Sequence, residues 1–583
     1  MKARDDNIRL KPGRIRDKGL AASNLKSFVA QVMRAAKKAG HSGRDFGRSG
    51  SSARSTFGRG RAAAVAASLR SPARRVVIKA RVVRHRSLRF RSAPLSQHLA
   101  YLKRDGVSRD GEPARMFDVN SDAADERDFT ERTADDRHHF RFIVSPEDAT
   151  EMADLRAFTR DLMRRAEQDL GSRLDWVAVD HWNTDNPHIH VLARGVVEDG
   201  ADLVISRDYI SRGLRGRAEQ LVALELGPRT DQEVSRVLES EVTVERWTGL
   251  DRALRAASDE SGGLIDLRPG GGPKNPELRR LMIGRAMKLE RLGLAAPVGP
   301  ASWTLKAGHE ETLRELALRG DIIKTMHRAL AREGRSVAAD NLAIHGKEPP
   351  NILGRLADRG LHDELTGSAY VVIEGVDGRA HHLRFADLAA TGDAASGTIV
   401  EARSFEGADG RRRLTLAVRS DLSLDQQVTA PGATWLDRQL VVRESTQLAG
   451  GGFGLDVRES LERRIDHLAS EGLAKRQGQR VVFARDLLDM LRRRELDQVT
   501  GKLAAEMGLA HMPVAEGDHV AGIYRQRLSL ASGRFAMIDN GLGFELLPWK
   551  PALEQKLGPQ VSGVMLPGGG VDWSFGRKRG LGL

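Results

Sequence analysis

The spacing of hydrophobic and polar residues predicts an alternation of strands and helices from about residue 73 onward. Residues 76–83 contain a run of β-branched side chains, which favours an extended strand. A helix is expected at residues 95–103. After a polar loop, the alternating pattern of residues 139–144 predicts a second strand.

The next segment predicts a helix followed by two strands. Ser145 suits the N-cap and Pro146 the first turn of a helix whose apolar face leads to Gly171. Residues 174–181 and 188–196 predict two strands joined by a short turn, which is the pattern of an antiparallel hairpin. The predicted order is therefore βα-βα-ββ with a closing hairpin.

Further helices and an internal repeat follow in the rest of the chain. Residues 207–226 predict an amphipathic helix, and Asn275-Pro276 predicts the start of another. The pattern Leu-x3-Gly-Leu-Ala begins at Leu289 and again at Leu468, each time after an amphipathic helical stretch. This repeat favours two small winged-helix-like modules.

The predicted fold class is α+β: a domain with a central antiparallel sheet flanked by helices, followed by helical, winged-helix-like and small β-barrel-like modules. Barrels are expected because residues 369–419 and 516–547 alternate apolar and polar side chains around Asp-Gly and Asn-Gly turns. The predicted segments are a basic, largely disordered arm (1–70), the sheet domain (71–255), a helical segment (256–365), a β-rich module (366–430) and an α+β module (431–583).

Basic charge is concentrated near the N-terminus. The first hundred residues contain 25 lysines and arginines against four acidic residues, whereas the rest of the chain contains 68 basic and 75 acidic residues. A concentrated cationic arm indicates a polyanionic partner, of which nucleic acid is the commonest. A solvated tail of the same composition is the alternative.

The composition also limits the chemistry. The chain has no cysteine, which excludes disulfides, thiolate metal sites and a cysteine nucleophile, so a metal must be held by His, Asp or Glu. No stretch approaches the roughly 20 consecutive apolar residues that span a bilayer, and the N-terminus lacks the apolar segment of a signal peptide. We therefore expect no membrane insertion and a cytoplasmic location.

Three histidines lie in the predicted closing hairpin. Side chains two apart on a strand face the same way, so His188 and His190 project from one side of the sheet. The short turn brings His181 of the preceding strand beside them by antiparallel pairing. A single histidine on a strand is usually structural, but three converging imidazoles with open coordination positions suit a divalent metal ion.

A nucleophile must accompany such a metal, and tyrosine is the candidate because cysteine is absent. The chain has four tyrosines: Tyr101, Tyr209, Tyr370 and Tyr524. The last two lie far from the histidines along the chain, which leaves Tyr101 first and Tyr209 second. Lys103 and Arg104 beside Tyr101 suit phosphate binding, and Gly106 suits a hinge. A plain core residue of an amphipathic helix is the alternative for Tyr101.

These residues resemble the motifs of HUH relaxases, the mobilisation nucleases of conjugative plasmids and integrative elements. The metal motif of that family resembles residues 180–191, which read Asp-His-Trp-Asn-Thr-Asp-Asn-Pro-His-Ile-His-Val. Tyr101-Leu102-Lys103-Arg104 resembles the N-terminal catalytic motif, and residues 139–148 resemble the middle motif. The likeness spans about residues 73–230 and is closest to relaxases with a long, uncharacterised C-terminal region.

The resemblance implies that residues 71–255 form a HUH relaxase domain in which Tyr101 is catalytic and the three histidines hold Mg²⁺ or Mn²⁺. It implies site-specific nicking and transfer of single-stranded DNA at an origin of transfer through a 5′-phosphotyrosyl intermediate. Lys103, Arg104 and Arg194 are the DNA-binding candidates. The implied partners are accessory DNA-binding proteins and a type IV secretion coupling protein, and the implied location is the bacterial cytoplasm, with transfer to a recipient cell.

One departure and several alternatives stay open. Many relatives have Asp two residues after the first histidine, where this chain has Asn183, so Asp180 and Asp185 are the candidates for an acid that orients a ligand. A rolling-circle replication initiator or a transposase shares the histidines but usually places its tyrosine after them. A non-catalytic DNA-binding regulator would use the winged-helix-like segments. A metal hydrolase of small molecules would leave the cationic arm without a role.

Overall fold

The structure, a computed structural model, describes most of the chain from residue 71 onward. The described residues are 65, 69, 71–85, 93–103, 108–109, 114–182, 186–270, 273–332, 334–335, 337–346, 348–407, 410, 412–442, 446–478, 480–567 and 569–574. The predicted basic arm therefore lies almost wholly outside the described residues. One compact unit contains residues 235–244 and 248–309, and a larger one contains residues 72–234, 245–247 and 310–583.

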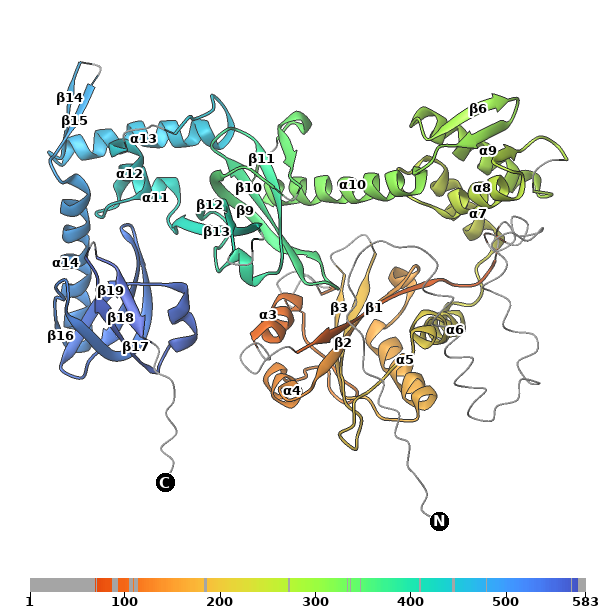
Figure 1. The fold of residues 1–583 in the computed structure, drawn as a ribbon, viewed down its shortest axis with the longest axis horizontal. Helices are drawn as coiled ribbons and strands as arrows, with labels where there is room; N and C mark the ends of the chain where they lie inside the picture. The colour runs from red at the N-terminus through yellow and green to blue at the C-terminus, as the bar shows by residue number, and fades with distance from the viewer. Residues whose placement is uncertain are drawn as a thin grey trace, which may run out of the picture. The chain divides into compact units, whose positions relative to one another are not determined.

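A four-stranded antiparallel sheet carries the three histidines (Figure 1). Its order is β1-β2-β4-β3, and its strands are β1 (Val76–Arg84), β2 (His138–Pro146), β3 (Trp176–His181) and β4 (His188–Arg194). The helices of this domain are α3 (Ala93–Leu102), α4 (Glu126–Thr133), α5 (Leu155–Leu170), a π-helical turn (Tyr209–Leu214) and α6 (Arg215–Leu226). The prediction of an antiparallel sheet flanked by helices is confirmed.

Each face of this sheet packs against a different pair of helices. Phe142 and Val191 belong to a buried core with α5 and α6 on one face. Val179 and Leu99 belong to a second core with α3 and α4 on the other face. His181 follows Val179 by two positions in β3, so strand alternation puts it on the face that α3 covers.

Two local predictions in this domain are wrong. The polar loop before β2 contains α4, whose N-cap Asp125 accepts hydrogen bonds from the backbone amides of Arg127 and Asp128. Ser145 and Pro146 belong to β2, because Val76 of β1 pairs with Pro146 and the sheet pairing overrides the local helix-start signal. The helix begins later, at Leu155 after the N-cap Asp154.

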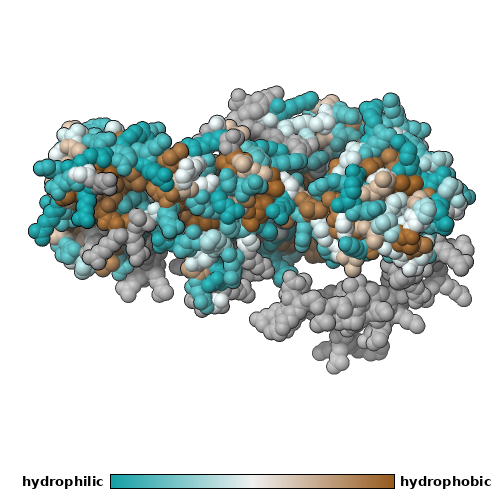
Figure 2. Space-filling view, turned by 90° about the horizontal axis from the view of Figure 1, so that it is seen from above, coloured by the Kyte–Doolittle hydropathy of each residue, from teal (hydrophilic) through white to brown (hydrophobic). Residues whose placement is uncertain are grey.

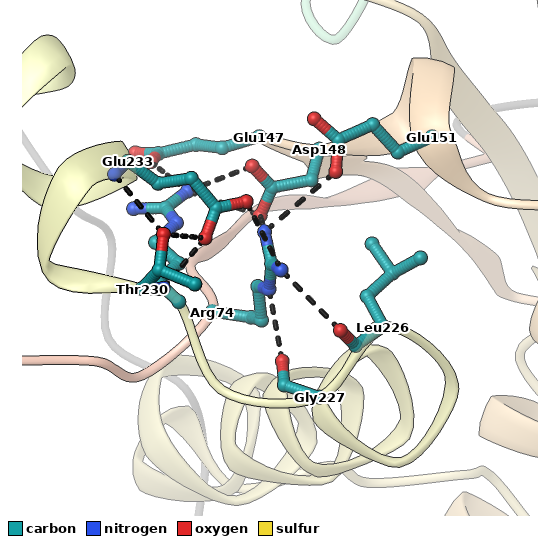
Figure 3. Close-up of polar contacts among 9 residues, drawn as sticks. Arg74, Glu147, Asp148, Glu151, Leu226, Gly227, Thr230 and Glu233 are labelled. Carbon is teal, nitrogen blue, oxygen red and sulfur yellow. Dashed lines mark hydrogen bonds and ion pairs between the residues drawn. The ribbon is translucent and has the colours of Figure 1, made fainter.

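Two buried arginines link the start of β1 and the end of β2 to the end of α6 through hydrogen bonds and ion pairs (Figure 3). The Nε of Arg74, just before β1, donates to the carbonyl oxygen of Gly227 at 3.0 Å, and its Nη1 lies 3.3 Å from Asp148. Arg229 pairs with Glu147 at 2.8 Å and with Asp148 at 3.0 Å. The acidic end of the middle motif, Glu147-Asp148, therefore neutralises buried structural arginines.

The smaller unit is built from helices and a three-stranded sheet of order β5-β7-β6. Its elements are the greater part of α7 (Asp231–Thr243), α8 (Gly249–Glu260), β5 (Leu264–Asp266), α9 (Pro276–Arg291), β6 (Ala295–Gly299) and β7 (Ser302–Leu305). Asn275 caps α9 and Pro276 is its first residue, as predicted. The long helix α10 (His309–Arg332) follows.

The rest of the larger unit contains two six-stranded sheets with helices between them. The first, of order β13-β12-β9-β10-β11-β8, is built from β8 (Leu342–Ile344), β9 (Ile352–Asp363), β10 (Ser368–Gly375), β11 (Ala380–Phe385), β12 (Ile399–Glu406) and β13 (Arg412–Ser420). The connecting elements are α11 (Leu424–Thr429), α12 (Trp435–Val441), α13 (Gly452–Ser470), the hairpin β14 (Ala474–Gln477) and β15 (Arg480–Phe483), and α14 (Leu487–Met507). Because β8 and β9 belong to the first sheet, this module begins before residue 366, where the sequence placed its boundary.

The second six-stranded sheet has the order β16-β19-β18-β17-β20-β21. Its strands are β16 (Ala510–His511), β17 (His519–Leu530), β18 (Gly533–Asp539), β19 (Gly543–Pro548), β20 (Gln560–Met565) and β21 (Val571–Ser574). Together with the other sheets it confirms the α+β class.

The predicted internal repeat consists in both copies of a helix followed by a two-stranded hairpin. The first copy is α9 with β6 and β7, and the second is α13 with β14 and β15. In the first, the buried Arg285 makes two 2.8 Å hydrogen bonds to Asp251. In the second, the buried Arg464 does the same with Asp437. The repeat therefore extends from a short sequence pattern to a matching buried ion pair.

Figure 2 shows hydrophilic residues over most of the face in view, with apolar residues in small patches between them. Among the described residues, no helix has both the length and the apolar character that crossing a bilayer requires.

Candidate metal centre

The register of the closing hairpin brings the three predicted histidines together. His181 pairs with His188, and Val179 pairs with His190, so all three imidazoles lie on one face of β3 and β4. The Nε2 atoms of His188 and His190 are 3.1 Å apart, and the ring centres of His181 and His190 are 4.5 Å apart. His181 and His190 are buried, and His188 is half-buried. The predicted convergence is confirmed.

A carboxylate that the sequence did not reveal completes the cluster. Glu364 lies in the turn between β9 and β10, and its Oε2 is 3.1 Å from Nε2 of His188 and 2.9 Å from Nε2 of His190. Its Oε1 is 3.8 Å from Nδ1 of His181. One potential ligand atom from each of the four residues lies within 4.8 Å of every other. Ligands held about 2.1 Å from an octahedral ion are about 3 Å apart, so the closest of these distances fit a shared ion.

Backbone carbonyls hold two of the imidazoles in place. His181 uses Nε2 to bind the carbonyl oxygen of Leu102 at 2.8 Å, and His188 uses Nδ1 to bind that of Asn186 at 3.0 Å. A proton on each of these nitrogens leaves Nδ1 of His181 and Nε2 of His188 with lone pairs toward the cluster. Such hydrogen bonds fix the tautomer of metal-binding histidines.

The turn that carries Glu364 is itself ordered by side-chain hydrogen bonds. The backbone amides of Leu365 and Thr366 donate to the carboxylate of Asp363, and the amide of Gly367 donates to its carbonyl oxygen. Burial alone would raise the pKa of Glu364, but His190 and His188 outweigh burial and hold the pKa well below its ordinary value. The carboxylate is therefore ionised beside the imidazoles.

Tyr101 lies in the last turn of α3, directly before the Leu102 carbonyl that binds His181. Its hydroxyl faces β9: a methyl group placed on Gly360 would lie 2.6 Å from the Tyr101 oxygen and 3.1 Å from that of Tyr370. The side chain also lines a cavity of about 930 Å³. The backbone next to Tyr101 therefore contacts the histidine cluster, whereas the Tyr101 hydroxyl lies beside β9, in the C-terminal half of the chain.

The other tyrosines have different surroundings. Tyr370, set aside because of its distance along the chain, lies across Gly360 from Tyr101 and donates to Asp358 at 2.8 Å. Tyr209 donates to Asp169 at 3.0 Å, and burial together with Asp169 raises its pKa. Tyr209 packs against the core of the opposite sheet face, so it does not approach the histidines.

The remaining predicted site residues do not gather at the cluster. Asp180 is bound by Arg156 at 3.0 Å and by the Trp182 indole at 2.8 Å, and strand alternation turns it away from His181. The prediction that Asp180 orients a metal ligand is therefore wrong. Lys103 pairs with Glu126, and Arg194 pairs with Asp136 and Asp175. The candidate residues Arg104, Gly106, Asn183 and Asp185 lie outside the described residues.

Two further buried polar residues lie on the same side of the sheet and were not predicted. Burial and Arg141 hold the pKa of His98, on α3, well below its ordinary value. Burial and the neighbouring Arg81 lower the pKa of Arg141 to about 10. Arg141 donates to His139 at 3.0 Å, and in the described part of the chain it forms no ion pair with a carboxylate. A buried cation near the cluster favours anion binding.

Comparisons with known proteins give one match. No curated protein and no solved structure matches the chain. A family model described as "Protein of unknown function (DUF3363)" matches residues 282–410 and 401–582, which together make up more than half of the chain. Glu364, Gly360 and Tyr370 lie in the matched region, whereas Tyr101 and the three histidines precede it. The chain belongs to the family of proteins of unknown function described as DUF3363.

Proposed function

We propose that this protein is a metal-dependent relaxase that nicks one DNA strand and transfers it through Tyr101. The observation that carries the proposal is the group of His181, His188, His190 and Glu364, in which the carbonyl of Leu102 ties His181 to the helix that bears Tyr101. The resemblance of these segments to the HUH relaxase motifs supports the same function. The DNA substrate is a single strand at an origin of transfer.

The four residues fit a divalent metal ion. Neutral imidazole nitrogens and an ionised carboxylate oxygen are ligands for Mg²⁺, Mn²⁺ and related ions, and the backbone carbonyls fix two of the rings. A bound ion would neutralise the non-bridging oxygens of the scissile phosphate. His181, His188, His190 and Glu364 would hold it, and Mg²⁺ or Mn²⁺ is the expected cofactor.

The residues of the chain perform the transfer itself. The Tyr101 oxygen attacks the scissile phosphorus, a P–O bond forms to the tyrosine, and the bond to the 3′ oxygen breaks. The phenolic proton leaves Tyr101, and the released 3′ oxygen takes up a proton. One phosphodiester replaces another, so the step is close to isoenergetic and the strand can be rejoined without ATP.

Trapping of the covalent adduct tests this proposal. The full chain is incubated with Mn²⁺ and pooled single-stranded oligonucleotides from a candidate origin region, and detergent-resistant DNA–protein adducts are mapped by mass spectrometry. Tyr101→Phe keeps the ring and removes the oxygen, so the adduct should disappear. Tyr209→Phe is the matched control, because Tyr209 lies on the opposite face of the sheet, and it should retain the adduct.

An adduct that persists in Tyr101→Phe would contradict the assignment of the nucleophile. Tyr370→Phe then becomes the next test, since its hydroxyl lies across Gly360 from Tyr101. Adduct formation at full rate in excess chelator would remove the metal from the proposed function.

A further inference from the structure

The cavity beside Tyr101 is built mainly by the family-matched region. Its volume of about 930 Å³ is near the upper end of the range of roughly 300–1,000 Å³ that is typical of ligand sites. Tyr101 and Ala100 contribute from α3. The other lining residues include Arg359 of β9, Arg419 of β13, Arg438 of α12, Arg534 of β18, and Trp549.

Two of these arginines are already neutralised. Arg534 binds Asp421 at 2.6 Å and Asp393 at 2.8 Å. Arg419 binds Glu401 at 2.6 Å. These arginines stabilise the wall of the cavity and leave little charge for a ligand.

The other two arginines have only neutral partners. Arg359 donates to the carbonyl of Gly392 and to the hydroxyl of Thr391, and Arg438 donates to the carbonyl of Ser532 at 2.7 Å. Within the described ranges, no carboxylate forms an ion pair with Arg359 or Arg438. Burial lowers the pKa of both groups. Nearby carboxylates oppose this shift, namely Asp393 at Arg359 and Asp437 and Glu495 at Arg438, but none of the three forms an ion pair with either guanidinium.

Arg359 is half-buried and Arg438 is exposed, so an anion that enters the cavity can form charge-assisted hydrogen bonds with both. The cavity wall also has apolar side chains, among them Leu416, Val418 and Leu530, on which planar groups can pack. A ligand with anionic groups joined to flat apolar ones satisfies both features, and a single strand of nucleic acid has this composition.

We propose that this cavity binds the single DNA strand next to the phosphate that Tyr101 attacks, with Arg359 and Arg438 as its phosphate contacts. This inference rests on the proposed function, because Tyr101 marks where the scissile phosphate lies. In this arrangement the family-matched region holds the strand that becomes joined to Tyr101. The cationic segment near the N-terminus then adds affinity elsewhere along the DNA.

Salt-dependent binding tests the inference without any cleavage. The full chain and the double variant Arg359→Gln/Arg438→Gln are titrated, in EDTA, into a short fluorescent thymidine oligonucleotide over a range of salt concentrations, and anisotropy is read. Each phosphate contact that is lost should flatten the plot of log affinity against log salt by about 0.7. The double variant should therefore show a clearly flatter slope and at least about a tenfold weaker affinity at low salt.

Matched variants separate this effect from general loss of charge or fold. Arg476→Gln/Arg525→Gln removes two exposed arginines that are paired with carboxylates and do not line the cavity, and it should keep the slope of the unmodified chain. Val418→Trp narrows the cavity without changing charge, and it should weaken binding at every salt concentration while the slope stays constant. Arg359→Lys/Arg438→Lys should retain most of the slope, which a misfolded protein would not.

An unchanged slope and affinity in the glutamine double variant would overturn the inference. Equal losses for duplex and single-stranded DNA would overturn the assignment to a single strand. The proposed function fails separately: if the unmodified chain forms no adduct but the cavity variants lose oligonucleotide binding, the cavity stands and the nicking proposal falls. If adducts form and the cavity variants bind the oligonucleotide normally, the nicking proposal stands and the cavity inference falls.

Discussion

Two groups of histidines in the larger unit are arranged differently. In the cluster at β3 and β4, three imidazoles and Glu364 direct atoms toward one another within 4.8 Å. Beside β8 and β11 of the first six-stranded sheet, Nε2 of His345 is 2.9 Å from Nδ1 of His381, and Nε2 of His381 is 2.9 Å from a carboxylate oxygen of Asp377. The second group is a chain of paired hydrogen bonds. Among the described residues, the first group brings its potential ligand atoms close enough to share one metal ion, and the second does not.

Strand spacing explains this difference. His188 and His190 are two residues apart and share a sheet face, whereas His381 and His382 are adjacent and point to opposite faces. His382 therefore stacks on Tyr370 while His381 reaches His345. A count of histidines does not distinguish the two groups, but the interval between them along a strand does.

The largest expected effect on nicking comes from removing His190 of the first group. The same change at His381 of the second group is its control. His190→Ala should reduce nicking at least about a hundredfold, the size of effect seen when one electrostatic contact to a transition state is lost. His381→Ala is the matched variant, because both side chains are almost fully buried, and it should leave nicking nearly unchanged. Rates of oligonucleotide cleavage in Mn²⁺ measure both. Oligonucleotide binding should survive in both variants, and similar losses of cleavage in the two would end the distinction between the groups.

A smaller effect, on the affinity for Mn²⁺, is expected when the carboxylate of the first group is replaced by an amide. Glu364→Gln should weaken Mn²⁺ binding at least about tenfold, because a neutral amide replaces an ionised ligand. Asp377→Asn, which changes the acid of the second group, should leave Mn²⁺ binding unaltered. Calorimetric titration with Mn²⁺ alone measures both. Faster nicking together with unchanged Mn²⁺ affinity in Glu364→Gln would instead identify Glu364 as a residue that blocks the site until DNA enters.

The sequence reveals the first group only in part, for physical reasons. The interval between His188 and His190 and the short turn after His181 are local features, and a strand's alternation translates them directly into geometry. Glu364 and Tyr370 reach the site through the β9–β10 hairpin, a contact between segments far apart in the chain that no local pattern encodes. Ser145-Pro146 fails as a helix start for the same reason, since pairing with β1 outweighs local preference.

The last comparison concerns the acid stability of the fold and a histidine of the second group. Burial, His362 and Arg384 lower the pKa of His382 from 6.5 to about 4. The unfolded chain therefore binds a proton at this position as the pH falls below 6.5, while the folded chain binds it only near pH 4, so acid favours unfolding. Between pH 7 and pH 5 this single group should cost about 2 kcal/mol of stability. His345 and His362, whose pKa values burial also lowers, add to the loss in the same direction. Urea denaturation at the two pH values, compared between the unmodified chain and His382→Gln, isolates the contribution of His382. The variant should lose less stability on acidification, and an identical loss in both proteins would show that His382 titrates normally in the fold.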